Sequence, residues 1–168
     1  KEQGRYLGVT KEMWAIGSPT SLINIEKEDS NLERIIRDII NKPSGEIMPR
    51  DVRRIVELVA NEEGIMNLNV IQHLTNLERL SLEFNRIRDI SPLAALKRLS
   101  HLSLNDNRLS DISALAGLKR LKNLALHHNS IEIIDALAGL TNLDDLNLWG
   151  NHISDISPLE GLGRLEQL

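Results

Sequence analysis

The chain has 168 residues and a formal net charge of −4 at pH 7, a balance that gives no support for a nucleic-acid partner. It contains no cysteine, which excludes a disulfide framework, a thiol nucleophile and a thiolate metal site. Apolar residues make up 41% of the chain and aromatic residues only 2%, so the core must be built from leucine and isoleucine. No run of 18 apolar residues is present, and we therefore expect no membrane insertion.

Residues 1–29 are interpreted as an N-terminal arm. Ile23 and Ile25 alternate there with polar neighbours, a pattern typical of a short edge strand. Because the sequence begins at Lys1 and carries no signal peptide, we interpret it as a processed or trimmed segment.

Residues 30–54 are predicted to form a helical cap. Ser30 or Asn31 can cap its first helix. The apolar residues that recur at helical spacing are Leu32, Ile35, Ile36, Ile39 and Ile40. A second short helix is expected from about residue 50 to residue 59, opening with Pro49 and Asp51.

A frame of 22 residues, L-x-x-L-x-L-x-x-N-x-I, fills the rest of the chain and is the leucine-rich repeat pattern. Full repeats occupy residues 77–98, 99–120, 121–142 and 143–164. Residues 55–76 are a degenerate first repeat in which Glu63 replaces the asparagine. Leu165 and Leu168 begin a truncated fifth, so we expect the natural protein to continue.

The repeat predicts an α/β solenoid, right-handed and gently curved, with a parallel sheet on its concave side. The L-x-L stretch makes each strand, over residues 79–83 in the first full repeat. Leu80 and Leu82 point inward, and the residues between them point outward by strand alternation. The return path is too short for an α-helix of several turns, so 3₁₀ or irregular turns are expected on the convex side.

The asparagines of the frame are predicted to be structural. They are Asn85, Asn107, Asn129 and Asn151. Each lies at the turn after a strand, where its amide can bond unpaired backbone groups, and stacked copies would form an asparagine ladder. Leaving such groups unpaired costs about 1–3 kcal/mol, which we expect of Asn85→Ala.

The third full repeat departs from the frame on the convex side. Asp89, Asp111 and Asp155 mark one position, but Ile133 stands there in the third repeat, and an aspartate follows two residues later. We expect a local distortion of this turn and an Ile133 that is exposed or covered by a partner.

The chain resembles the internalin-type leucine-rich repeat proteins of bacteria. Residues 85–96 and 151–162 match N-x-I-x-D-I-S-P-L-x-x-L, which is close to the consensus of that family, and residues 31–51 resemble its helical cap. The resemblance covers about residues 23–168. It implies a protein-binding module, often displayed at the bacterial surface, in which the concave residues vary freely.

The concave face is the predicted binding surface, and its outward positions supply the candidate partner-binding residues. They are Arg79, Glu83, Phe84, His101, Asn105, Asp106, His127, His128, Asp145 and Trp149. Aromatic residues at such positions are typical interface anchors. Phe84 either serves as an anchor or tucks into the turn as part of the core. Trp149 either anchors a partner or packs on His127 or on further repeats.

The histidines do not predict a metal site. His127 and His128 are adjacent and should diverge on a strand, and His101 lies ~13 Å along the strand axis from the position of His127. Asp106 and His128 occupy one position in neighbouring repeats, which predicts a hydrogen-bonded pair. A pH-sensitive contact is favoured over a metal centre.

We find no pattern that predicts catalysis. The chain has no G-x-S-x-G and no glycine-rich phosphate loop, and we expect it to be a non-enzyme without cofactors. Basic residues gather at one edge, where each repeat re-enters its strand: Lys97, Arg98, Lys119, Arg120, Lys122 and Arg164. This basic rim is either a solvated edge or a docking site for an acidic protein or a polyanionic cell-wall polymer.

These observations predict a monomeric protein-binding module of a bacterial surface or secreted protein, with another protein as its ligand on the concave face. Two alternatives stay open. The chain could be an intracellular scaffold or regulatory subunit, because similar 22-residue repeats occur in phosphatase regulators, or the targeting domain of a larger enzyme.

Overall fold

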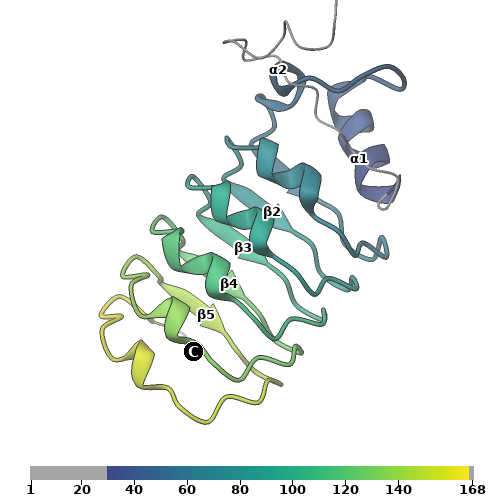
Figure 1. Cartoon of the computed structure of the whole chain (residues 1–168). Helices are drawn as coiled ribbons and strands as arrows, with labels where there is room; N and C mark the ends of the chain where they lie inside the picture. Colours follow the sequence, from purple (N-terminus) through teal and green to yellow (C-terminus); the bar gives the residue numbers. More distant parts are fainter. Residues whose placement is uncertain (1–29, 167–168) are drawn as a thin grey trace, which may run out of the picture.

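A computed structural model describes residues 30–166, which form a single stack of coils that starts at a helical end (Figure 1). The expected N-terminal arm with its edge strand, and Leu168 of the fifth repeat, lie outside the described residues. Among the described residues, no helix combines the length and the apolar character that a membrane crossing requires.

The cap begins with helix α1, Ser30–Ile40, which lies at one end of the stack (Figure 1). Its apolar side is buried against the first coil, and Leu32 and Ile36 are fully inaccessible to solvent. On its other side Arg37 pairs with Glu33 one turn earlier at 2.7 Å. The helix therefore covers the apolar end of the repeat stack.

The second cap helix is shorter than the sequence predicts. Helix α2 comprises only Pro49–Val52, followed by strand β1, Glu57–Val59. The prediction of a helix up to residue 59 was wrong, because this segment instead forms the first strand of the sheet and buries Leu58. Its β-branched residues also favour a strand over a helix.

Five short strands form one parallel sheet in sequence order. After β1 they are β2 (Arg79–Ser81), β3 (His101–Ser103), β4 (Asn123–Ala125) and β5 (Asp145–Asn147). Each residue pairs with the residue 22 positions later, as in Leu80 with Leu102. The fixed register gathers equivalent positions of successive repeats into rows across the concave side (Figure 1).

Turns of 3₁₀ helix line the opposite, convex side, as the repeat frame predicts. They are η2 (Asn69–His73), η3 (Ser91–Ala95), η4 (Ser113–Gly117), η5 (Asp135–Leu137) and η6 (Ser157–Leu159). Leucine and isoleucine side chains from both sides meet between sheet and turns in one continuous core, and most of them are fully buried. Burial of this aliphatic interior is the main stabilising contribution to the stack.

The asparagine side chains join neighbouring repeats. Asn85 accepts a hydrogen bond from the backbone N–H of Ile65 at 2.9 Å and donates to the carbonyl groups of Ala60 and Leu82. The equivalent bonds recur at the other three asparagines of the ladder. Each asparagine thus satisfies backbone groups of its own coil and of the coil before it.

The convex turn of the third full repeat is not distorted at its start. Ile134, which precedes η5, has φ −121° and ψ 19°, against −118° and 18° at the equivalent Ile112. The turn is shorter than η3 and η4, with three residues instead of five, but η6, which keeps the aspartate, is equally short, so the shortening does not follow from Ile133. Ile134 is buried like Ile90 and Ile112 and holds the start of the turn in place. Ile133 itself is 69% exposed, as predicted.

Candidate functional site

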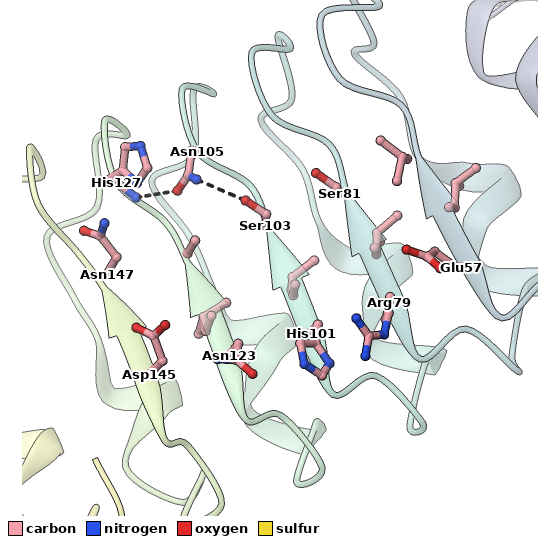
Figure 2. A pocket seen from close by; sticks show the side chains of 16 residues that line it. Glu57, Arg79, Ser81, His101, Ser103, Asn105, Asn123, His127, Asp145 and Asn147 are labelled. Carbon is pink, nitrogen blue, oxygen red and sulfur yellow. Dashed lines mark hydrogen bonds between the residues drawn. The ribbon is translucent and has the colours of Figure 1, made fainter. Parts of the chain in front are cut away.

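The concave face carries a groove of about 500 Å³ that crosses all five strands (Figure 2). Its polar lining comes from outward strand positions and from two residues just past the strand ends: Glu57, Arg79, Ser81, His101, Ser103, Asn105, Asn123, His127, Asp145 and Asn147. Five of the ten predicted partner-binding residues line it, namely Arg79, His101, Asn105, His127 and Asp145. The other five, which are Glu83, Phe84, Asp106, His128 and Trp149, lie where the chain leaves the strands.

One row of the groove carries both signs of charge. Figure 2 shows Glu57, Arg79, His101 and Asp145 on different strands along this row. Among the described residues, no ion pair involves Glu57, Arg79 or Asp145. Their charges are therefore satisfied by solvent and are available to a ligand.

His101 lies in the middle of this row, in surroundings that disfavour the protonated form of its imidazole. Burial is the main cause that lowers the pKa of His101 below its ordinary value, and the positive charges of Arg79 and Lys122 add to it. Its Nδ1 lies 2.8 Å from Oγ of Ser100. The imidazole is thus kept neutral and partly buried in the floor of the groove.

A neighbouring row of small side chains gives the groove its depth, and these residues were absent from the predicted site. Ser81, Ser103 and Ala125 occupy equivalent positions on β2, β3 and β4. The sequence does indicate this row, because small residues recur there at a spacing of 22 residues. A search for large anchoring side chains passes over such positions, because their contribution is the space they leave.

Asn105, predicted to contact a partner, is instead used inside the fold. It is only 6% exposed, its Oδ1 accepts the backbone N–H of His127 at 3.1 Å, and its Nδ2 donates to Oγ of Ser103 at 3.0 Å (Figure 2). Glu83 is likewise engaged, because its Oε1 accepts the hydroxyl of Ser103 at 2.5 Å. We therefore do not count Asn105 among the contact residues.

Phe84 projects from the turn after β2 and is 54% exposed. The alternative that it tucks into the core is not found. Its backbone has φ +54°, in the left-handed region that a bulky residue rarely adopts. The backbone is nevertheless held there by the bond from its N–H to the carbonyl of Asn105 at 3.0 Å. An exposed phenyl ring on a constrained backbone is a suitable anchor for a partner.

Trp149 is 72% exposed in the last full repeat. Its ring lies 4.5 Å from that of His128 at an interplanar angle of 61°, so its neighbour is His128 and not His127, which was one of the alternatives to an anchoring role. The close approach depends on Gly150, where a Cβ atom would come within 2.5 Å of Cδ2 of His128. The histidine ring therefore occupies the space left free by this glycine.

His127 and His128 do not diverge as strand alternation predicts. The strand β4 ends at Ala125, and His128 has φ +54°, so the alternation of side chains is broken between the strand and this residue. Both rings approach Asp106: Nδ1 of His128 lies 3.1 Å from its Oδ1, and Nε2 of His127 lies 3.7 Å from its Oδ2. The predicted hydrogen bond between Asp106 and His128 is present.

The basic rim is partly neutralised by its neighbours. Arg98 pairs with Glu78 of the same repeat at 3.3 Å, and Arg164 pairs with Asp144 at 3.4 Å. Lys119 donates to a backbone carbonyl of the next repeat at 3.1 Å. These contacts favour a solvated edge over a continuous cationic stripe, because exposed pairs of this kind weaken the field that a polyanion would meet.

The comparisons with known proteins agree with this architecture. The sequence profile of the family described as Leucine Rich repeats (2 copies) matches residues 75–117 and 119–161. The structure of internalin C2 (InlC2) from Listeria monocytogenes superposes with a TM-score of 0.68 at 30% sequence identity, over 87% of this chain and 75% of that chain. This chain belongs to the internalin-type leucine-rich repeat proteins.

Another internalin from Listeria monocytogenes, InlF, superposes on the same repeats with a TM-score of 0.84 at 38% identity. The match covers 89% of this chain and 45% of that one, so the chain spans less than half of InlF. The structure titled PEPR1-AtPEP1 has a TM-score of 0.62 at 24% identity over 73% of this chain and 19% of its own, and it shares the fold alone. The comparison with curated proteins gave no match.

Membership of this family places the chain among repeat proteins that bind other proteins. Leucine-rich repeats form an extended concave surface and bind other proteins with it.

Proposed function

We propose that the chain is the ligand-binding module of a bacterial surface or secreted protein, and that it binds a protein on its concave face. The likeness to two internalins of Listeria monocytogenes supports a bacterial, surface-associated role. The proposal assigns no catalysis to the chain. A signal sequence or a wall-anchoring segment in the complete protein would separate this role from that of an intracellular scaffold.

The observation that carries the proposal is the exposure of two aromatic side chains at the edge of the concave face, beside the groove. Phe84 and Trp149 are 54% and 72% exposed and stand where strands β2 and β5 end. Aromatic side chains are enriched among the residues that contribute most to binding, because they bury a large area at a small entropy cost. A ligand that covers both would span the four full repeats, from β2 to β5.

The groove beside the two aromatic residues indicates the character of the partner. Its small-residue row admits protruding side chains, and its charged row offers Arg79 to an acidic group and Asp145 to a basic one. We therefore expect a folded protein surface with charges of both signs, held at its ends by apolar contacts. Charge complementarity of this kind mainly sets specificity and association rate.

The test compares ligand capture by the wild-type chain with capture by a Phe84→Ala/Trp149→Ala variant. The bait is immobilised and exposed to surface and secreted proteins of the source organism, and the affinity for any captured protein is then measured by biolayer interferometry. We expect the double variant to bind at least about tenfold more weakly, since each anchor contributes more than ~1 kcal/mol. Its thermal midpoint should stay within a few degrees of wild type.

The matched control is Ile133→Ala, which removes a side chain of similar exposure from the convex side. It should bind like the wild type. If the double variant retains full affinity for a protein that the wild type binds, the concave face is not the site, and the basic rim becomes the next candidate. A fall in thermal midpoint in the double variant would assign the aromatic residues to stability instead.

A further inference from the structure

Two histidines and one aspartate converge at the edge of the concave face, outside any role that the proposed function gives them. The donor atoms of Asp106, His127 and His128 all lie within 4.8 Å of one another. The side chains are partly exposed, at 27%, 26% and 43% respectively, so an ion from solvent can reach them. We propose that these three residues form a binding site for a divalent first-row transition-metal ion, and Zn²⁺ is the ion used to test it.

The repeat geometry explains why these side chains meet. Asp106 and His128 occupy the same position in successive repeats, and both have a left-handed backbone, with φ +53° and +54°. Adjacent strands of a sheet lie about 4.8 Å apart, so equivalent side chains of neighbouring coils start within reach of each other. The left-handed residue also ends the strand alternation, which turns His128 toward the side where His127 already lies.

The donor set suits a transition-metal ion better than a hard cation. Imidazole nitrogens are favoured by zinc, copper, nickel and iron, whereas calcium and magnesium prefer oxygen ligands alone. Bonds of about 2.0–2.2 Å to a tetrahedral ion place its ligand atoms roughly 3.4 Å from one another. Nδ1 of His128 lies 3.1 Å from Oδ1 of Asp106, and Nε2 of His127 lies 3.7 Å from Oδ2, so each nitrogen is near that spacing from one oxygen of the carboxylate.

Packing holds the ligands in place before an ion arrives. The backbone N–H of His127 donates to Asn105 at 3.1 Å, and the backbone N–H of Asp106 donates to the carbonyl of His127 at 3.0 Å. The ring of His128 lies against that of Trp149 and over Gly150. An ion would therefore bind side chains whose positions are already restricted, which reduces the entropy cost of binding.

The surroundings of His127 set the expected strength of the site. Its Nδ1 is buried and has no hydrogen-bond partner among the described residues, which leaves Nε2 as the nitrogen that faces Asp106. Zinc-binding histidines usually donate their second N–H to an acceptor, and loss of that contact weakens metal binding by about 10–100-fold. We therefore expect a dissociation constant on the order of 1–100 µM, with a fourth coordination position open to water or to an outside donor.

The test is isothermal titration of Zn²⁺ into the purified, tag-free chain. Wild type should bind one ion per chain, and Asp106→Asn and His128→Gln should each weaken binding at least about tenfold. His101→Gln is the matched control, because His101 lies on the same face but outside the three-residue cluster, and it should bind like the wild type. Circular dichroism without metal verifies that each variant is folded.

A second measurement reports directly on the position of the ion. In a Trp14→Phe background, the fluorescence of Trp149 should be quenched by Cu²⁺, because its ring lies 4.5 Å from that of His128. The proposal is overturned if wild type shows no saturable Zn²⁺ binding up to about 1 mM, or if folded Asp106→Asn and His128→Gln variants bind as tightly as wild type. Neither outcome affects the proposed function, because protein binding was assigned to other anchors.

Discussion

At the scale of single residues, hydrogen bonding to buried backbone decides which positions are structural and which are free to bind. The ladder asparagine Asn85 donates and accepts within the fold, and so does Asn105 two positions from the end of β3. Asn123 has no side-chain hydrogen bond among the described residues and faces the groove. The same residue type thus serves stability at two positions and leaves its amide available at the third.

Substitution of Asn85 by alanine should therefore destabilise the chain by about 1–3 kcal/mol, because backbone groups of two coils lose their partner. Urea unfolding followed by circular dichroism measures the change in free energy of unfolding. Asn123→Ala is the comparison and should change that free energy by less than about 0.5 kcal/mol. Equal effects of the two substitutions would show that the ladder contributes nothing beyond an ordinary surface side chain.

Strand alternation predicted single residues well only as far as the strands extend. Leu80 is buried and its neighbours Arg79 and Ser81 reach the groove, as the alternation requires. Beyond the strand ends the rule fails, because Phe84 and His128 adopt a left-handed backbone. The side chains at these two positions do not favour it, and its only signals in the sequence are Asp106 and Gly150 at the equivalent position of other repeats. This explains why the sequence allowed two placements of Phe84 and why the approach of His127 to Asp106 was not predicted, although the pair of Asp106 with His128 was.

His101 should make the stability of the chain depend on pH in a defined window. Its pKa in the folded state is lowered by burial and then by Arg79 and Lys122, so the unfolded chain binds the proton more tightly. The contribution of the neutral imidazole is complete above the unfolded value near 6.5 and is lost as the pH falls toward the lowered folded value.

We expect His101→Gln to lose less stability than wild type between about pH 7.5 and pH 5.5, as measured by urea unfolding at several pH values. Glutamine keeps a polar group near Ser100 but does not titrate. The difference between the two curves isolates His101 from the other histidines. Parallel curves would mean that His101 titrates alike in the folded and unfolded chain.

At the scale of elements, one hydrogen bond closes most of the convex turns. Asp89, Asp111 and Asp155 each accept the backbone N–H of the serine two residues later at 2.8 Å. These backbone bonds are the main cause that lowers the pKa of Asp111 and of Asp155 below the ordinary value. The third full repeat has Ile133 instead and lacks this bond, yet its turn begins in the same conformation.

Restoring an acceptor at this position should stabilise the chain. Ile133→Asn supplies a neutral oxygen for the backbone N–H of Asp135, and we expect a gain of about 0.5–1 kcal/mol in free energy of unfolding. Ile133→Ala removes the exposed isoleucine without adding an acceptor and serves as the comparison in the same urea experiment. If the asparagine variant is no more stable than the alanine variant, the turn gains nothing from the added bond.

The strands and turns were largely predictable from the sequence, because the chain repeats the same 22-residue pattern several times. The 22-residue frame fixed the strands and the convex turns, and the fold class was confirmed by the internalin structures. The error at residues 53–59 arose in the degenerate repeat, where the asparagine is replaced by Glu63 and the leucine spacing is weak. There the pairing of β1 with β2, which follows from the 22-residue register of the degenerate repeat, outweighed the helical pattern.

At the scale of the whole molecule, the contribution of a residue to the free energy of unfolding depends on its place along the stack. Every coil contacts mainly its neighbours, so an interior coil is covered on both sides. Ile90, Ile112 and Ile134 occupy one repeat position and are at most 2% exposed, whereas Ile156 at the same position is 61% exposed. The last described coil therefore leaves one side of its apolar layer open, while α1 closes the other end of the stack.

This difference in burial along the stack predicts very different losses of stability when isoleucine is replaced by alanine at the same repeat position. Ile112→Ala should lower the free energy of unfolding by about 2–4 kcal/mol, because it leaves a cavity in a closed layer. Ile156→Ala should lower it by less than about 0.5 kcal/mol, because most of that side chain is already in solvent. Both are measured by urea unfolding under identical conditions. The pair is matched in residue type and repeat position, so only the covering coil differs between them. Similar losses in free energy of unfolding for the two variants would mean that the stack does not gain its stability from one coil covering the next.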